Sequence, residues 1–204
     1  MDGVKKIHKI ERLDHKIICD LIEPEARVLD LGCGDGDLLY HLAVERKAKV
    51  QGIELNEGAI YKCVEKGVSV FHGDIEVGLK GYPDKSFDYV LLNQSMQETK
   101  NVEFVIHEAL RVGTKIIVGF PNFAYFKARF RIFFRGRVPI TRSLPYHWYT
   151  TPNLHFLSIK DFQDYAHDKK LKVLKSFYLA HKKEMNFFPN MFALNAIFVL
   201  TNPT

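Results

Sequence analysis

The sequence predicts an α/β fold built around a mostly parallel sheet. A short apolar strand that ends in an acid, residues 28–31, leads into a loop with glycine at every second position, Gly32, Gly34 and Gly36. A leucine-rich helical run follows, and strand, glycine turn and helix together open a nucleotide-binding α/β unit. Strand and helix patterns then alternate up to residue 120, which is typical of a parallel sheet with right-handed crossovers.

The elements of the first half follow from hydrophobic spacing and from breakers. Apolar residues recur at helical spacing between residues 9 and 22, and Pro24 ends this helix. Tyr89 to Leu92 form an unbroken apolar run, which suits a strand covered on both faces. Pro121 breaks the fifth strand. The pattern predicts helices over 9–22, 57–66 and 102–112, and strands over 27–31, 48–54, 68–71, 87–93 and 114–120.

The second half has a different composition. Residues 122–137 are rich in aromatics and arginine, and residues 138–157 form a loop long enough to be more often functional than filler. Ser158 with Asp161 three residues later is an acidic variant of a capping box and predicts a helix over 158–169. Two closing strands are expected over 172–180 and 193–201. We therefore expect one domain over residues 1–204, with an insertion or lid at roughly 121–157.

Bulk composition excludes several classes of protein. The 204 residues are 47% hydrophobic and carry a formal net charge of +5, which permits an acidic partner without requiring one. No run approaches a membrane span, and the first six residues do not open a secretory signal, so we expect no stable membrane insertion. Three scattered cysteines, Cys19, Cys33 and Cys63, favour neither disulfides nor a zinc site. A cytoplasmic location is therefore expected.

The glycine loop differs from a dinucleotide fingerprint. Its third glycine comes one residue early, and Asp37 stands where that fingerprint has glycine. Asp35 and Asp37 also occupy the place where a pyrophosphate needs the positive end of a helix. The loop therefore favours a ligand that carries an ammonium and a sulfonium over one that carries phosphates. This pattern resembles the first motif of class I S-adenosylmethionine (SAM) methyltransferases.

The candidate SAM-binding residues follow the ends of successive strands. Glycines let the backbone approach a ligand, Asp30 can accept from its amino group, and an acid at position 54 can bind a ribose diol. The resemblance implies that Asp74 binds the adenine amino group and that the end of the fourth strand faces the transferred methyl. A plain turn at the glycines, a helix cap at Asp74 and a chain turn at Asn93 remain the structural alternatives. The candidates are Asp30, Gly32, Cys33, Gly34, Gly36, Glu54, Leu55, Asp74, Ile75 and Asn93.

The sequence assigns no catalytic residue. It has no Asn/Asp-Pro-Pro-aromatic motif after the fourth strand, no Pro-Cys and no histidine pair at metal spacing. A base-methylating enzyme and a nucleic-acid partner are therefore not expected, and neither is a metal. Methyl transfer from a sulfonium needs mainly positioning, so a general base is not essential. SAM or S-adenosylhomocysteine is the expected ligand, whether or not it reacts.

Four blocks in the second half narrow the resemblance. Residues 119–123, 144–149, 151–156 and 159–162, together with the glycine loop and the strand end at Glu54, resemble the MetW family, the "methionine biosynthesis protein W" group of bacteria. The resemblance covers residues 27–201. It implies a Rossmann-like class I methyltransferase fold: a seven-stranded, mostly parallel sheet, helices on both faces and an antiparallel last strand.

The same resemblance implies an unusual function. The family works with homoserine O-acyltransferase (MetX-type) of methionine biosynthesis as an activating or regulatory subunit. A SAM-binding subunit there would act as a feedback sensor, because a ligand that binds two states unequally shifts their populations. The alternatives are a SAM-dependent methyltransferase on a small-molecule acceptor and a membrane-associated enzyme on a lipid-like acceptor.

A basic aromatic segment, residues 123–137, bears on this choice. Its phenylalanines, Phe126, Phe130, Phe133 and Phe134, fall at helical spacing among five lysines and arginines. It is a lid helix packed on its own sheet, a docking surface for a partner, or a helix on a membrane surface. His147, Trp148, Tyr149 and His155 either line the pocket mouth or pack within an ordered loop.

Overall fold

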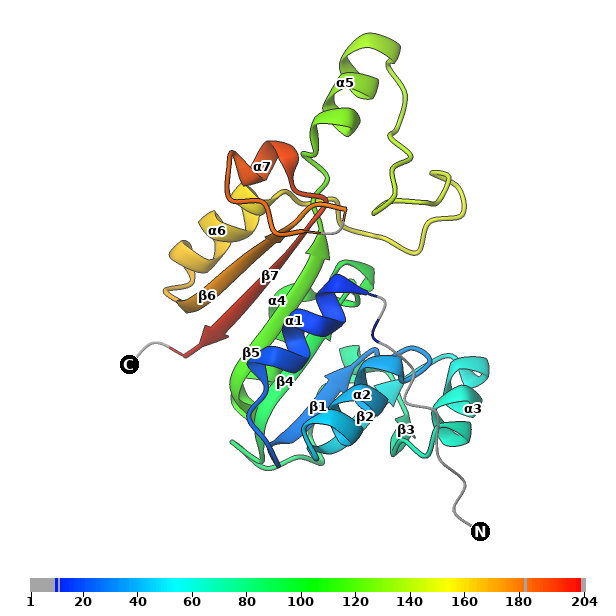
Figure 1. Ribbon diagram of the computed structural model, residues 1–204, viewed down its shortest axis with the longest axis vertical. Coiled ribbons are helices and arrows are strands. Elements are labelled where there is room, and N and C mark those ends of the chain that lie inside the picture. The colour runs from blue at the N-terminus through cyan, green and yellow to red at the C-terminus, as the bar shows by residue number, and fades with distance from the viewer. Residues whose placement is uncertain (1–9, 11, 182, 203–204) are drawn as a thin grey trace.

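The computed structural model describes residues 10, 12–181 and 183–202. Its centre is a seven-stranded sheet in the order β3-β2-β1-β4-β5-β7-β6 (Figure 1). Only β7 runs antiparallel to its neighbours, β5 and β6, and the other neighbouring pairs are parallel. The strands are β1 (Arg27–Leu31), β2 (Lys49–Glu54), β3 (Val70–His72), β4 (Phe87–Asn93), β5 (Gly113–Pro121), β6 (Lys172–Leu179) and β7 (Asn195–Thr201).

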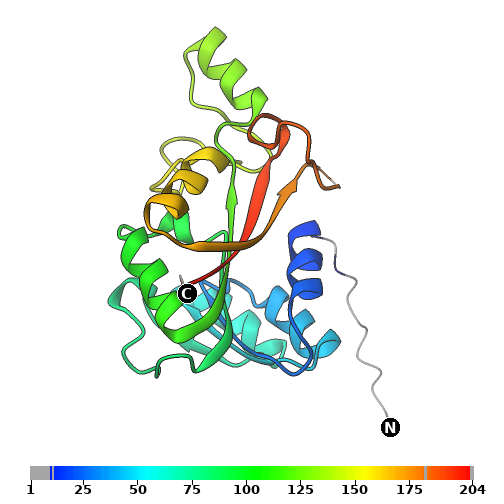
Figure 2. The same ribbon diagram turned by 90° about the vertical axis from the view of Figure 1, so that its left-hand side faces the viewer.

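Helices cover both faces of the sheet (Figure 2). On one face α4 and α6 pack with the side chains of Val118 and Phe120. On the other face α1, α2 and α3 pack with those of Val28 and Leu91. The helices are α1 (Leu13–Leu21), α2 (Asp37–Glu45), α3 (Glu57–Glu65), α4 (Val102–Val112), α5 (Phe126–Arg135), α6 (Ile159–Asp168) and α7 (Pro189–Phe192), with short 3-10 turns η1 (Ile75–Val77) and η2 (Met96–Glu98).

The predicted fold class is confirmed, and most boundaries agree to within two residues. The predicted capping box is present: Asp161 N–H donates to Ser158 Oγ (3.2 Å), and Ser158 N–H donates to Asp161 Oδ2 (2.8 Å). The first helix begins at Leu13, and Lys9 lies outside the described residues.

Pro121 ends the fifth strand, as the sequence analysis expected, although the proline itself belongs to the strand, one residue beyond the predicted end. It is the last residue of β5 and pairs with Asn195 of β7. Its parallel neighbour β4 has already ended opposite Gly119, so the missing N–H of proline leaves no β4 carbonyl unpaired.

The insertion between β5 and α6 leaves the sheet. Helix α5 stands at one end of the molecule, and the chain after it returns toward the sheet (Figures 1 and 2). Of the ten residues of α5, only Ala128 is buried. The expectation of a lid helix packed on its own sheet is therefore wrong for α5. No helix in the described part of the chain has the length and apolar character needed to cross a membrane.

Candidate functional site

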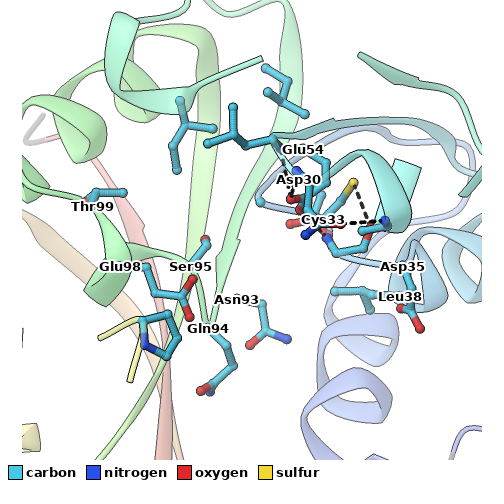
Figure 3. A pocket seen from close by; sticks show the side chains of 18 of the residues that line it. Asp30, Cys33, Asp35, Leu38, Glu54, Asn93, Gln94, Ser95, Glu98 and Thr99 are labelled. Carbon is cyan, nitrogen blue, oxygen red and sulfur yellow. Dashed lines mark hydrogen bonds between the residues drawn. The ribbon is translucent and has the colours of Figure 1, made fainter. Parts of the chain in front are cut away.

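The carboxyl ends of β1, β2 and β4 meet at one edge of the sheet and open onto a cavity of about 850 Å³. This is where parallel α/β sheets bind ligands, and the volume lies within the range of small-molecule sites. In Figure 3 the strand end of β4 and the turn after it face the glycine loop and Glu54 across this space. Nine of the ten predicted residues line the cavity: Asp30, Gly32, Cys33, Gly34, Glu54, Leu55, Asp74, Ile75 and Asn93.

The three glycines of the loop all have positive φ, but only Gly34 opens on free space. A Cβ on Gly32 (φ +76°) would lie 2.7 Å from Ser95 Cβ, and one on Gly36 (φ +77°) would lie 2.9 Å from Cys63 Sγ. A Cβ on Gly34 (φ +57°) would meet nothing within 4 Å, and Gly34 is one of the residues that line the cavity. Gly36 is the one predicted site residue that does not line the cavity. It is the N-cap residue of α2.

Glu54 links the second strand to the glycine loop. Its Oε2 accepts from the N–H of Gly34 (2.8 Å), and its Oε1 accepts from the N–H groups of Leu55 (2.9 Å) and Asn56 (2.8 Å). A carboxylate has about four lone-pair positions, and these three bonds occupy three of them, so Oε2 can still accept from a hydroxyl. The backbone therefore holds this carboxylate in one orientation beside the cavity.

Asp30 is a buried carboxyl without a full set of partners. It is 3% exposed, and its Oδ1 has no hydrogen-bond partner in the described part of the chain. Burial, with a smaller contribution from the charge of Glu54, raises the pKa of Asp30 to about 7. An unpartnered acid is costly to bury, and a cation placed beside it would relieve that cost. This feature fits a ligand with a positive charge.

The charges around the whole cavity also favour a ligand with a positive charge. Its lining holds two long cationic side chains, Arg12 and Lys100, and seven carboxyl groups, those of Asp30, Asp35, Asp37, Glu54, Asp74, Glu76 and Glu98. A phosphate-rich ligand would face net repulsion here.

The two acids of the glycine loop, Asp35 and Asp37, are not free charges as the sequence analysis assumed. Lys66 Nζ lies 2.5 Å from Asp37 Oδ1 and 3.5 Å from Asp35 Oδ2, and it also donates to the carbonyl of Asp35. The acids of the loop are therefore partly neutralised by a lysine on the chain just after α3. The preference for a cationic ligand depends more on Asp30 and Glu54 than on these two residues.

Asp74 has the capping role that the sequence analysis kept as an alternative. Its Oδ1 accepts from Glu76 N–H at 2.8 Å at the start of η1. The same residue lines the cavity, so the cap does not remove it from the site. Leu55, 60% exposed, and Ile75 supply apolar surface on this side.

Asn93 is the last residue of β4, and a hydrogen bond to α1 fixes its side chain. Its Nδ2 donates to Asp14 Oδ2 at 3.1 Å, and Asp14 in turn pairs with Arg12. Its Oδ1 has no partner among the residues that the structure describes. Gly119 on β5 makes room for this side chain, because a Cβ there would lie 2.3 Å from Asn93 Oδ1.

Sequence reasoning missed the residues that other elements bring to this edge. Arg12 and His15 come from the start of α1, and Glu98 comes from η2. Burial lowers the pKa of His15 to about 4, so it is neutral near pH 7, whereas burial and Glu54 raise the pKa of Glu98. No local signal marks these side chains, because helix packing alone brings them to the cavity.

The insertion reaches the same cavity through Tyr146 and Pro152. The chain beyond them is fastened to η2, since Leu154 N–H and His155 N–H both donate to the carbonyl of Gln97 (2.9 and 3.0 Å). None of the four side chains considered for the pocket mouth, His147, Trp148, Tyr149 and His155, lines this cavity, and Trp148 is 72% exposed.

A second cavity, of about 470 Å³, adjoins the first and shares Arg12, Gln94, Glu98 and Tyr146 with it. Gln94 follows β4 with φ +66°, a conformation that costs energy in a non-glycine residue and is common at functional sites. Within the described ranges, no three His, Cys, Asp or Glu side chains are grouped so that they could hold a metal ion.

Comparison with known proteins gives both a family and a fold. The family model described as "Methionine biosynthesis protein MetW" matches residues 12–200. A bifunctional methionine biosynthesis protein, MetXA/MetW, of Rhodopirellula baltica is 34% identical over 161 residues. This match covers 74% of the present chain and 26% of that protein, so the chain spans about a quarter of its relative's length.

Solved structures at lower identity share the fold. A SAM-dependent methyltransferase of Thermotoga maritima is 21% identical, with a TM-score of 0.63 over 93% of this chain and 87% of that one. The [4+2]-cyclase SpnF is 16% identical, with a TM-score of 0.64 over 93% of this chain and 80% of that one. Since a methyltransferase and a cyclase both have this fold, the fold alone does not fix the reaction.

Proposed function

Since this chain belongs to the methionine biosynthesis protein MetW family, we propose that it binds SAM and regulates a homoserine O-acyltransferase as its partner subunit. The observation that supports this most is the buried, incompletely partnered Asp30 at the base of a carboxylate-rich cavity. A ligand with an ammonium and a sulfonium satisfies that charge pattern, whereas a phosphate-bearing one does not.

The residues around the cavity fit the parts of SAM. Asp30 is the acceptor for the ammonium, Glu54 for the ribose hydroxyls and Asp74 for the adenine amino group. Gly34 leaves space at the loop, and Leu55 and Ile75 offer apolar surface to the adenine. Asn93 would lie near the sulfonium, which supplies a methyl group wherever an acceptor is present.

The partner is supported by the relative from Rhodopirellula baltica. Its name joins MetXA to MetW in one bifunctional protein, and this chain matches about a quarter of that protein. Units that are fused in one protein are candidates for association where they are separate chains. The regulation then has a simple basis: SAM shifts the complex toward whichever state binds it more tightly.

Binding of SAM at pH 7 is expected to release about half a proton, because Asp30 with a pKa of about 7 is half protonated in the free chain. The ligand's ammonium favours the charged carboxylate and so lowers this pKa. Calorimetry in buffers of different ionisation enthalpy measures the released protons. Asp30→Asn should abolish the release, and the control Asp164→Asn, at an exposed position of α6, should leave it unchanged. Proton-neutral binding by the unaltered chain would contradict this role of Asp30.

The function itself is tested with purified homoserine O-acyltransferase. We expect the chain to raise the enzyme's activity, and SAM to change that activity only when the chain is present. A chain that neither associates with the enzyme nor changes its rate, with or without SAM, would rule the proposal out.

The second cavity supports a second candidate function, methyl transfer to a small molecule. It adjoins the end of β4, where an acceptor would meet the methyl group, and it is lined by two amide groups whose oxygens lack partners in the described ranges, Gln97 Oε1 and Asn195 Oδ1. Formation of S-adenosylhomocysteine from SAM in a metabolite extract tests it. An absence of turnover across fractions of that extract would leave only the regulatory function.

A further inference from the structure

Helix α5 projects at one end of the molecule (Figures 1 and 2). Six exposed phenylalanines of α5 and of the segment before α7 make up what we call the aromatic ridge. Phe133 is the most exposed of them, at 81%. The ridge comprises Phe126, Phe130, Phe133 and Phe134 of α5 and Phe187 and Phe188 of the segment before α7.

The two parts of this aromatic ridge are continuous. Ring centroids of Phe130 and Phe134 lie 4.3 Å apart, and Phe192 bridges the parts at 5.9 Å from Phe126 and 6.1 Å from Phe187. With roughly 200 Å² for each aromatic side chain, the exposed fractions amount to about 750 Å². That exceeds the usual largest apolar patch of a monomer and approaches the roughly 800 Å² that each partner buries in a standard protein interface.

The charged side chains of α5 beside the aromatic ridge are all positive. Residues 109–160 contain no Asp or Glu. Lys127, Arg131 and Arg135 follow one another at four-residue spacing along α5, so they share one side of the helix. None of the three is paired with a carboxylate among the residues that the structure describes. This basic flank would repel a second copy laid against it and would attract an acidic surface.

The segment that presents the aromatic ridge also reaches the candidate SAM cavity. Tyr146 and Pro152 of the same insertion line that cavity, and Leu154 is hydrogen-bonded to the carbonyl of Gln97 in η2. A partner held on α5 would therefore contact a segment that touches the ligand. This connection between the docking surface and the ligand cavity favours a protein partner whose activity the ligand regulates over a lipid surface.

We propose that the aromatic ridge and its basic flank dock onto the acyltransferase subunit, in an apolar groove bordered on one side by carboxylates. This inference rests on the proposed function, which supplies the partner. The phenylalanines fill the groove, and Lys127, Arg131 and Arg135 pair with its carboxylates. Aromatic residues and arginine are enriched at the centres of protein interfaces.

The test compares the affinity of purified acyltransferase for the full chain and for two triple variants. Phe130→Ser/Phe133→Ser/Phe134→Ser removes the tip of the aromatic ridge, and K127E/R131E/R135E reverses its flank. Each should weaken binding at least about 30-fold while SAM affinity stays unchanged. The matched controls, Tyr61→Ser on α3 and the exposed triple K62E/K172E/K175E, should bind the acyltransferase like the unaltered chain.

The outcomes separate the two claims. If the unaltered chain does not bind the acyltransferase, the proposed function fails and the docking surface fails with it. If both ridge variants bind as tightly as the unaltered chain, the docking surface is wrong while the proposed function stands. Loss of binding to anionic phosphatidylserine vesicles, without loss of acyltransferase binding, would likewise overturn it in favour of a lipid surface.

Discussion

Glu54→Ala is expected to weaken SAM binding by about 100-fold or more, which corresponds to roughly 2.7 kcal/mol. The variant loses the acceptor proposed for the ribose, and a hydrogen bond to a charged group contributes about 1.5–3 kcal/mol. It also frees the N–H of Gly34, which Glu54 holds at 2.8 Å, so the glycine loop keeps only its backbone bonds from Gly32 and Cys33 to the carbonyl of Ile53 in β2. Isothermal titration calorimetry measures the affinity.

Two further variants show which loss matters. Glu54→Gln keeps the length of the side chain but lacks the charge and one acceptor, so it should lie between Glu54→Ala and the unaltered chain. Glu57→Ala, at the exposed start of α3 and outside the cavity lining, should bind SAM normally. Unchanged affinity in Glu54→Ala would show that this carboxylate does not touch the ligand.

Gly34→Val should abolish measurable SAM binding while the chain remains folded. Gly34 lines the cavity and an added Cβ would meet no protein atom within 4 Å, so we expect the added side chain to take room from the ligand. The positive φ of +57° adds backbone strain of about 1–2 kcal/mol. Calorimetry reports the affinity, and urea unfolding reports the stability.

Gly136→Val is the matched control for this strain. Gly136, at the end of α5, has φ +56° and also meets nothing within 4 Å, but it lies outside the cavity lining. Both variants should lose similar stability, and only Gly34→Val should lose the ligand. If both bind SAM like the unaltered chain, the cavity is not the SAM site.

Local patterns were sufficient where one element determines its own boundaries. The strand Phe87–Asn93 and the helix Val102–Val112 have the predicted bounds, because an apolar run and a helical period each end at clear breaks. The glycine loop and Glu54 were predicted from spacing, and the sheet brings them to one cavity, since parallel strands end at the same edge.

Features that depend on contacts between distant elements could not be read locally. Arg12 and His15 reach the cavity only because α1 packs beside α2, and no periodicity reports that. Lys66 neutralises Asp37 from a helix end 29 residues away, which the loop sequence alone did not reveal. The amphipathic pattern of α5 predicted a helix correctly, but a pattern does not tell an exposed aromatic face from a buried one.

The central claim is that carboxylates at the ends of β1 and β2 select a cationic adenosine compound. Titration of the purified chain with SAM, ATP and NAD in parallel, at neutral pH, tests it most directly. We expect saturable binding of SAM at one site per chain and no binding of the two phosphate-bearing compounds. Tight binding of ATP or NAD together with no response to SAM would contradict the account.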